Sequence, residues 1–177
     1  MDQLKTLVAH VGNLLGSEIT LAKGKQESID KLKSVLPEFP DSLLEYLKVF
    51  DGDNRILHPY WLLGAERILI AYRKLINQNQ MIGEYPSFVF SEPYPFQFDK
   101  FWRTNWIPIA ELNNEDYFFI DLDPGPGGKT GQIGFMESLE LNLIAGSLGE
   151  WFEAAIEKIT PPSEGENEWD DQIWYSI

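Results

Sequence analysis

The spacing of hydrophobic positions along the chain predicts a mixture of helices and strands. In residues 1–16, apolar side chains recur every three or four positions, which is the period of an amphipathic helix. The same period returns in four further segments, residues 29–36, 43–50, 64–78 and 148–159. We therefore expect five helices, with Ser28 or a neighbour capping the second and Ser147 opening a capping box before the last.

The centre of the predicted fold is the stretch from Trp106 to Met136. Residues 117–122 and 132–136 are runs of β-favouring side chains and predict two buried strands. Between them, residues 123–131 contain four glycines and two prolines, which exclude a helix and allow the chain to reverse. The sequence thus predicts two neighbouring strands joined by a glycine-rich turn.

Three other segments are also expected to be strands. They are residues 56–63, which Pro59 restricts to a sheet edge or a bulge, residues 87–92 and residues 141–145. Residues 96–102 contain four aromatic side chains, for which we expect a place in the core rather than in an exposed binding patch.

Gly128, Lys129 and Thr130 match the end of a phosphate-binding P-loop, G-x-x-x-x-G-K-[ST]. The match fails at Asp123, where the motif requires glycine. It also fails because residues 132–135 predict a strand where a P-loop opens a helix. We therefore interpret the segment as a turn, and we expect the chain to bind no nucleotide, other cofactor or metal.

Composition supports one folded domain without disulfides. The 177 residues are enough for a single core, 44% of them are hydrophobic, and none is cysteine. That leaves no disulfide, thiolate metal site or cysteine nucleophile. The N-terminus does not resemble a secretory signal, and no apolar run approaches the ~18 residues of a membrane span. We expect a soluble cytoplasmic protein.

Charge is the strongest compositional signal. Acidic residues outnumber basic ones by 28 to 14, which gives a formal net charge of −14 and a pI of about 4.4. Because phosphates must be neutralised by Lys and Arg, this charge argues against nucleic acid and anionic membranes as partners. A basic protein would instead be attracted, although acidity can also serve solubility alone.

The order of several short motifs resembles the Smi/Knr family of the SUKH superfamily. The motifs are Phe39-Pro40, Asp51-Gly52, WIPIA at 106–110, YFFIDLD at 117–123, the turn PGPGGKTGQI and Ala145-Gly-Ser147 before a helix. Together they cover roughly residues 25–160. The chain departs from the family at Phe39, where a leucine is usual, and at Asp51, where an asparagine is usual.

The resemblance implies an α+β fold, a single domain in which a mixed, mostly antiparallel sheet is wrapped by helices. We expect this domain at residues 1–160 and an acidic tail at residues 161–177. The resemblance also implies structural roles for the matching motif residues, in which Trp106 packs in the core, Asp121 caps the turn and the glycines hold the backbone. These motif residues are Gly52, Trp106, Pro108, Asp121 and Gly131.

The family is thought to bind proteins rather than to catalyse reactions, and its bacterial members resemble immunity proteins that neutralise secreted toxins, many of them nucleases. We therefore expect a protein that is not an enzyme but an immunity protein that binds a basic toxin domain. The expected contact residues are acidic: Glu111, Glu115, Asp116, Asp121 and Asp123, with Asp51 and Asp53 behind them. Such charges speed association and select the partner.

Three alternatives stay open at this point. The chain has no GxSxG or HExxH motif and its two histidines are 48 positions apart, which argues against common hydrolase sites. The acid pairs Asp121/Asp123 and Glu115/Asp116 could still form a glycosidase dyad or bind a hard cation. Fungal members of the family regulate cell-wall glucan synthesis, so a regulator or scaffold of that process is the third alternative. The sequence does not predict the oligomeric state.

Overall fold

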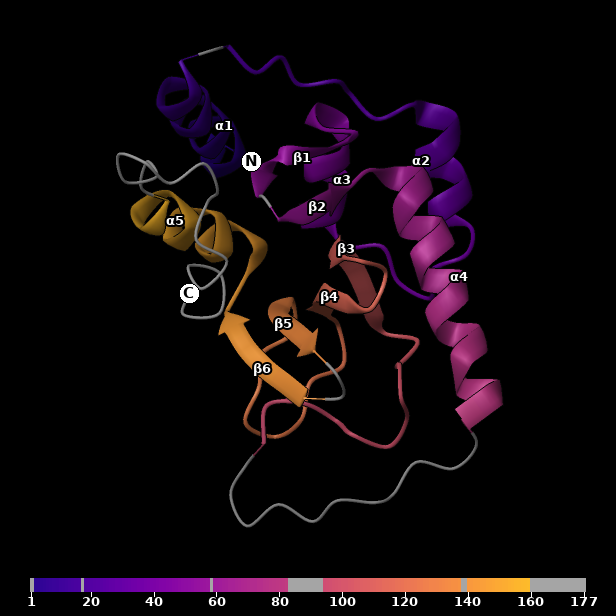
Figure 1. Ribbon diagram of the computed structural model, residues 1–177. Helices are drawn as coiled ribbons and strands as arrows, with labels where there is room; N and C mark the ends of the chain where they lie inside the picture. The colour runs from indigo at the N-terminus through magenta and orange to yellow at the C-terminus, as the bar shows by residue number, and fades with distance from the viewer. Residues whose placement is uncertain (1, 17, 58, 83–93, 138–139, 160–177) are drawn as a thin grey trace.

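A six-stranded antiparallel sheet forms the centre of the protein (Figure 1). The computed structural model describes residues 2–16, 18–57, 59–82, 94–137 and 140–159. The strands lie side by side in the order of the sequence: β1 (Gly52–Leu57), β2 (Tyr60–Leu63), β3 (Trp106–Leu112), β4 (Asp116–Asp121), β5 (Gln132–Glu137) and β6 (Glu140–Ala145). Each strand pairs antiparallel with the next. The predicted pairing of two central strands across the glycine-rich turn is confirmed.

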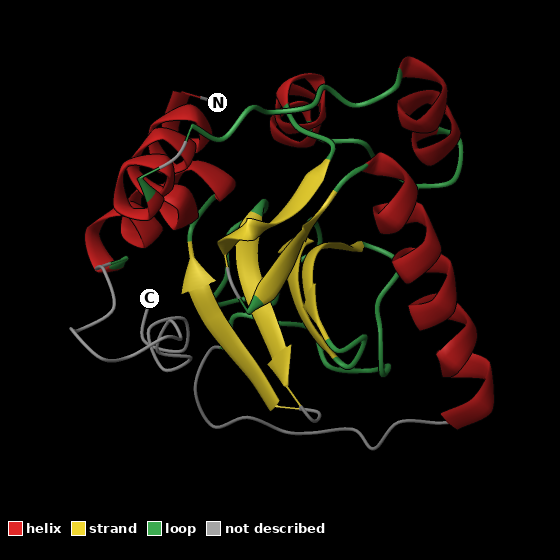
Figure 2. Cartoon of the chain, turned by 45° about the horizontal axis from the view of Figure 1, so that its top comes forward, coloured by secondary structure: helices red, strands yellow, loops and turns green. Residues whose placement is uncertain are grey.

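Helices surround this sheet, so the α+β prediction is confirmed (Figure 2). They are α1 (Asp2–Leu15), α2 (Gln26–Lys33), α3 (Asp41–Val49), α4 (Ala65–Ile82) and α5 (Leu148–Lys158). α1 packs against α5, and α2 packs against α4 on the other side of the molecule (Figure 1). Each amphipathic pattern buries its apolar face, as Leu4, Leu7 and Val11 do in α1. Within the described ranges, no helix has the length and apolar character needed to cross a membrane.

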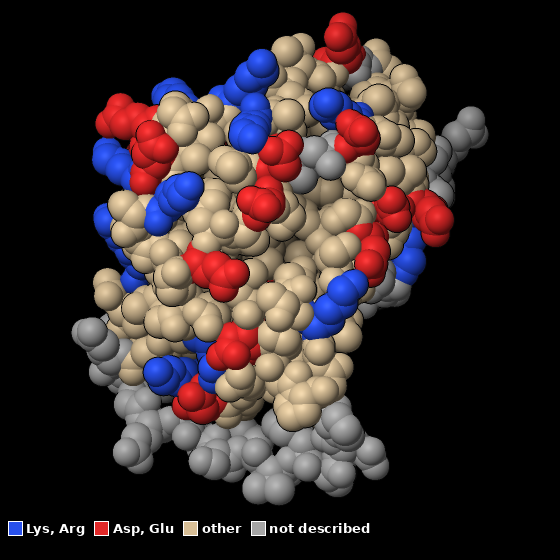
Figure 3. Space-filling model, turned by 180° about the vertical axis from the view of Figure 1, so that it is seen from behind, with Lys and Arg blue, Asp and Glu red and all other residues tan. Residues whose placement is uncertain are grey.

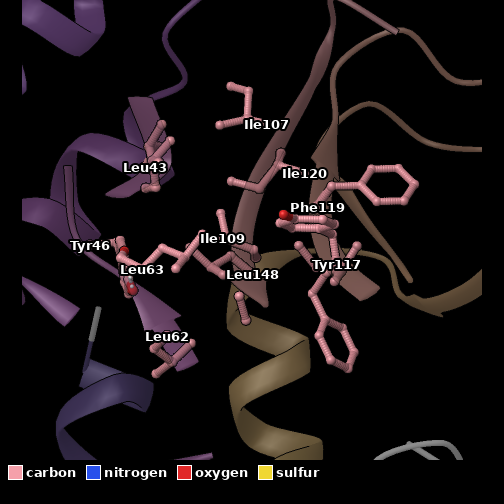
Figure 4. Close-up of a cluster of buried hydrophobic side chains, with 14 of the residues drawn as sticks. Leu43, Tyr46, Leu62, Leu63, Ile107, Ile109, Tyr117, Phe119, Ile120 and Leu148 are labelled. Atoms are coloured by element: carbon pink, nitrogen blue, oxygen red, sulfur yellow. Dashed lines mark hydrogen bonds between the residues drawn. The ribbon is translucent and has the colours of Figure 1, made fainter. Parts of the chain in front are cut away.

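One side of the sheet packs against α5 and α3. The ring of Phe118 in β4 lies 4.5 Å from that of Phe135 in β5 and 4.9 Å from that of Trp151 in α5, centroid to centroid. Tyr46 of α3 reaches the same core, where its hydroxyl donates to the Leu63 carbonyl at 2.9 Å (Figure 4). These contacts connect the first half of the chain to the last helix.

The other side of the sheet packs against α4 and residues 94–105. Trp106 is completely buried and stacks on Phe119, with their ring centroids 4.5 Å apart. Trp102 and Phe96 are also buried, so the prediction that residues 96–102 supply core aromatics is confirmed. Asn79 of α4 fixes this segment, because it donates to the Trp102 carbonyl at 2.6 Å and accepts from the Trp102 N–H at 2.9 Å.

Two details differ from the expectations. Residues 56–63 contain the end of β1 and all of β2, with Pro59 in the turn between them, because proline cannot donate to a ladder. The prediction of one strand there is wrong. α2 begins one turn earlier than expected and is capped at Lys25 without a side-chain hydrogen bond, so Ser28 lies inside the helix.

The capping box before α5 is present in a modified form. Ser147 Oγ accepts from the Glu150 N–H at 3.2 Å, as predicted. The Glu150 carboxylate accepts from the Gly146 N–H at 3.0 Å, one residue earlier than in the usual box. The predicted strand at 87–92 and the predicted acidic tail at 161–177 lie outside the described residues.

Candidate functional site

The glycine-rich connection between β4 and β5 is a closed turn rather than an anion site. The backbone N–H of Gly125 donates to the Pro95 carbonyl at 2.9 Å. The N–H of Gly127 donates to the Tyr94 carbonyl at 3.2 Å. β5 begins at Gln132, so a strand follows the Gly-Lys-Thr sequence, whereas a P-loop would open a helix there. The interpretation of this segment as a turn is confirmed.

Asp121 is the last residue of β4 and is completely buried. Its Oδ1 accepts from the Asp123 N–H at 3.0 Å, and its Oδ2 accepts from Gln132 Nε2 at 2.9 Å. The carboxylate therefore caps the turn, which is the structural role expected of it. Its burial also corrects the expectation that Asp121 belongs to a contact surface, because neither oxygen faces solvent.

Asp123 is partly exposed, but protein donors occupy its carboxylate. Its Oδ1 accepts from Gln97 Nε2 at 2.8 Å, and its Oδ2 accepts from Arg103 Nη2 at 2.7 Å. Arg103 also pairs with Asp99. Each of the four carboxylate oxygens of Asp121 and Asp123 thus accepts a hydrogen bond from a protein donor. Within the ranges that the structure describes, no three His, Cys, Asp or Glu side chains are grouped to hold a metal ion.

The buried position of Asp121 predicts a specific pH dependence. Burial raises the pKa of this carboxyl group above its ordinary value of 3.8, while the hydrogen bonds from Asp123 and Gln132 offset part of the rise. Because the folded chain then holds this proton more tightly, the contribution to stability is full below the ordinary value and is lost as the pH rises through the folded pKa.

The variant Asp121→Asn tests this pH dependence, because an asparagine side chain does not titrate. The free energy of unfolding of the wild type, minus that of Asp121→Asn, should fall as the pH rises from about 4 to about 7. Urea denaturation at several pH values measures both. A difference that rises over that range would contradict the raised pKa.

Acidic side chains gather at the end of the sheet where β3 turns into β4 and β5 turns into β6. Glu137 lies opposite Glu140 in the pairing of β5 with β6. Continuing the register of β4 and β5 by one residue from Tyr117 and Met136 brings Asp116 beside Glu137. Opposite residues of an antiparallel pair have Cβ atoms about 4.5–5.5 Å apart. We call the four residues at this position the acidic end: Glu115, Asp116, Glu137 and Glu140.

Among the residues that the structure describes, few basic side chains lie near the acidic end. No strand from β3 to β6 contains a basic residue. The basic side chain that the described part of the chain places nearby is Lys74 of α4, whose Nζ donates to the Asn114 carbonyl at 2.6 Å. Asn113 and Asn114 have positive φ angles, 54° and 59°, and form the tight turn that presents Glu115 to solvent.

Glu111 lies near the acidic end but has basic neighbours. It is on the opposite face of the sheet from Asp116, and its carboxylate lies 3.8 Å from Arg67 Nη1. The Arg67 guanidinium in turn lies 4.3 Å from the centroid of the Trp61 ring. The pKa of Glu111 is raised above its ordinary value. Burial causes the rise, and the charges of Arg67 and Lys74 offset part of it. Its side chain is only 14% exposed, so it offers little surface to a partner.

The other expected contact residues are not brought to this end. Asp121 pairs with Trp106 at the far end of β3, and Asp123 follows it. Asp51 precedes β1, whose first residue Gly52 pairs with Leu63 at the end of β2. The side chain of Asp53 lies outside the described part of the structure. The structure therefore groups Glu111, Glu115 and Asp116 and separates Asp51, Asp121 and Asp123 from them.

The remaining motif residues occupy special backbone positions. Gly52 and Gly131 have φ angles of 93° and 86°, a region that favours glycine. Pro108 lies beyond the two residues of β3 that pair with β2, at the point where the register of β3 and β4 shifts between Pro108 and Ala110. A proline there removes no ladder hydrogen bond to β2.

Charge is distributed unevenly along the chain. Residues 2–82 contain ten acidic and ten basic residues, whereas residues 94–159 contain eleven acidic and four basic ones. The other seven acidic residues lie in 83–93 and 160–177. Figure 3 shows acidic and basic side chains interspersed over one face of the molecule. The acidic excess of the described part therefore belongs to the segment that forms β3 to β6 and α5.

Comparison with known families agrees with this architecture. Residues 24–154 match the SMI1 / KNR4 family (SUKH-1). The match covers more than half of the chain, including all six strands of the sheet. The chain belongs to the SMI1/KNR4 family. The resemblance found in its motifs is thereby confirmed, and α1 is the helix of this SMI1/KNR4 protein that precedes the matched residues. No curated protein matches its sequence.

Sequence reasoning missed Glu137 and Glu140. β5 ends at Glu137 and β6 begins at Glu140, so only two residues separate these strands. Two apolar runs with such a short separation are typical of a hairpin, but Ser138-Leu139 lacks the Gly, Asn or Asp that usually marks its turn. The spacing alone could have placed both glutamates at the same end as Asp116.

Proposed function

We propose that this protein is a non-enzymatic, immunity-type member of the SMI1/KNR4 family that neutralises a toxin by binding its basic domain. Membership in the family supports a protein-binding role. The observation that carries the choice of a basic partner is the acidic end, in which Glu137 and Glu140 lie directly opposite each other beside Asp116.

The energetics of the acidic end favour such a partner. Like charges directly opposite each other in a sheet destabilise it, and a cross-strand pair is worth roughly 0.2–1 kcal/mol. Lys or Arg side chains from a partner relieve this repulsion when they bind between the carboxylates. The same charges attract a basic surface at a distance and raise the association rate.

Coexpression tests the proposal. If a gene beside this one encodes a secreted toxin with a basic C-terminal domain, coexpression of the two should protect cells from that domain. The two chains should also elute as one complex in size-exclusion chromatography. A toxin that kills regardless of this protein would contradict immunity. Capture of enzymes of cell-wall glucan synthesis instead would favour the regulatory role that the family resemblance also implies.

A further inference from the structure

α4 presents an apolar side chain to solvent among charged ones, three of them basic and one acidic. Ile70 is 61% exposed, more than Trp61, Leu15 or Leu143, the other large hydrophobic side chains that the structure describes as exposed. Positions three and four residues away along a helix lie next to a given residue. Around Ile70 these positions are all exposed and charged: Glu66, Arg67, Arg73 and Lys74.

A groove of about 280 Å³ lies beside Ile70, between α2 and α4. Leu69, which is only 8% exposed, contributes an apolar surface within it. Lys31 and Arg73 line it together with one acidic residue, Glu66, and two serines, Ser28 and Ser34. This volume is just below the ≈ 300–1,000 Å³ typical of small-molecule pockets, so one or two side chains of a protein segment match it better than a cofactor does.

The basic side chains around Ile70 differ in how far they are neutralised. Lys31 Nζ lies 3.6 Å from Glu27 Oε1, and Arg67 Nη1 lies 3.8 Å from Glu111 Oε1. Arg73 is exposed and has no hydrogen bond or ion pair with any residue that the structure describes. A guanidinium in this state has a planar set of N–H donors available, which matches the two oxygens of a carboxylate.

We propose that the α4 surface, formed by Ile70, Arg73, Lys31 and the groove between α2 and α4, binds a second protein through a segment that carries a large apolar side chain next to acidic residues. The apolar side chain packs on Ile70 and Leu69 in the groove. A neighbouring carboxylate binds Arg73. Arg is enriched among the residues that carry most of the binding energy of protein interfaces, which supports a contact at Arg73.

This surface is independent of the proposed function. The acidic end is formed by the hairpins of β3 to β6 and attracts basic groups, whereas the α4 surface attracts acidic ones. The protein could therefore hold two partners of opposite charge at once. Nothing in this proposal requires the first partner to be a toxin.

The test uses two labelled peptides with one central leucine, the first flanked by Glu and Asp and the second by Lys. Fluorescence anisotropy measures their affinity for the full chain, and amide NMR spectra map where they bind. The acidic peptide should shift the resonances of Ile70 and Arg73, and the lysine peptide should not. Ile70→Asp and Arg73→Glu should each raise the dissociation constant of the acidic peptide at least about tenfold, which corresponds to about 1.4 kcal/mol.

Asn13→Asp on α1 makes the same charge change as Ile70→Asp on another exposed helix position, and it should leave the affinity within about twofold. Equal binding of both peptides, or shifts confined to other residues, would overturn the proposal. So would self-association in sedimentation velocity that Ile70→Asp abolishes, because the surface would then be a contact between copies of this chain. Ile70 is largely exposed, so its replacement leaves the core intact.

Discussion

Reversing two charges at the acidic end, by Glu115→Lys together with Glu140→Lys, is expected to slow association with a basic partner by about tenfold or more at low ionic strength. Electrostatic steering raises association rates by about 10- to 1,000-fold, and it is lost when the attracting charges change sign. Stopped-flow or surface-binding kinetics measure the rate. The dissociation rate should change less, because both side chains are exposed.

The fold itself should tolerate this change and gain slightly from it. Glu140 lies opposite Glu137, so a lysine at position 140 replaces a like-charge pair with an attractive one and should stabilise the sheet by roughly 0.2–1 kcal/mol. Glu18→Lys with Glu38→Lys is the matched control, since both residues are exposed and lie outside the sheet. Equal slowing by the control pair would show that net charge, rather than the acidic end, governs association.

Trp106→Ala is expected to destabilise the protein by about 3–5 kcal/mol, which is a large part of the 5–15 kcal/mol that holds an ordinary domain folded. Trp106 is completely buried, and its ring lies 4.5 Å from Phe119 and 5.6 Å from Trp102. Its carbonyl also accepts from Trp102 Nε1 at 3.0 Å, which joins β3 to the segment before it. Truncation opens a cavity between the sheet and that segment.

Trp61 offers a control for this experiment, because it is the same residue type in the same sheet and is 40% exposed. Trp61→Ala should cost less than about 1.5 kcal/mol, since half-exposed side chains leave no cavity. Urea denaturation measures both variants. Equal losses for the two tryptophans would contradict the placement of Trp106 at the centre of the core.

The central strands could be predicted from the sequence because their apolar runs are dense and the turn between them is rich in glycine and proline. One reason for the close packing of these strands could not be predicted from the sequence. Gly134 of β5 lies against the Phe119 ring, and a Cβ added there would lie 2.3 Å from Phe119 Cζ. A lone glycine within a strand pattern indicates a close approach but does not say which side chain makes it.

The candidate contact surface was only partly predictable. Glu115 and Asp116 directly precede the apolar run at residues 117–122, which places them at one end of that strand, but nothing local shows that Asp121 is buried. The donor to its buried carboxylate is Gln132 Nε2, which also donates to the Pro95 carbonyl at 2.8 Å, far away in the sequence. Glu137 and Glu140 join Asp116 through the short connection between β5 and β6 and through the pairing of β4 with β5.

Hydrogen–deuterium exchange on the complex with a basic partner shows whether the acidic end is the contact surface. Binding should slow exchange at the two hairpins that carry the acidic end, around residues 112–117 and 136–141, and Glu115→Lys with Glu140→Lys should remove this protection. Protection confined to the glycine-rich turn or to α1, with these two hairpins unchanged, would contradict a contact at the acidic end.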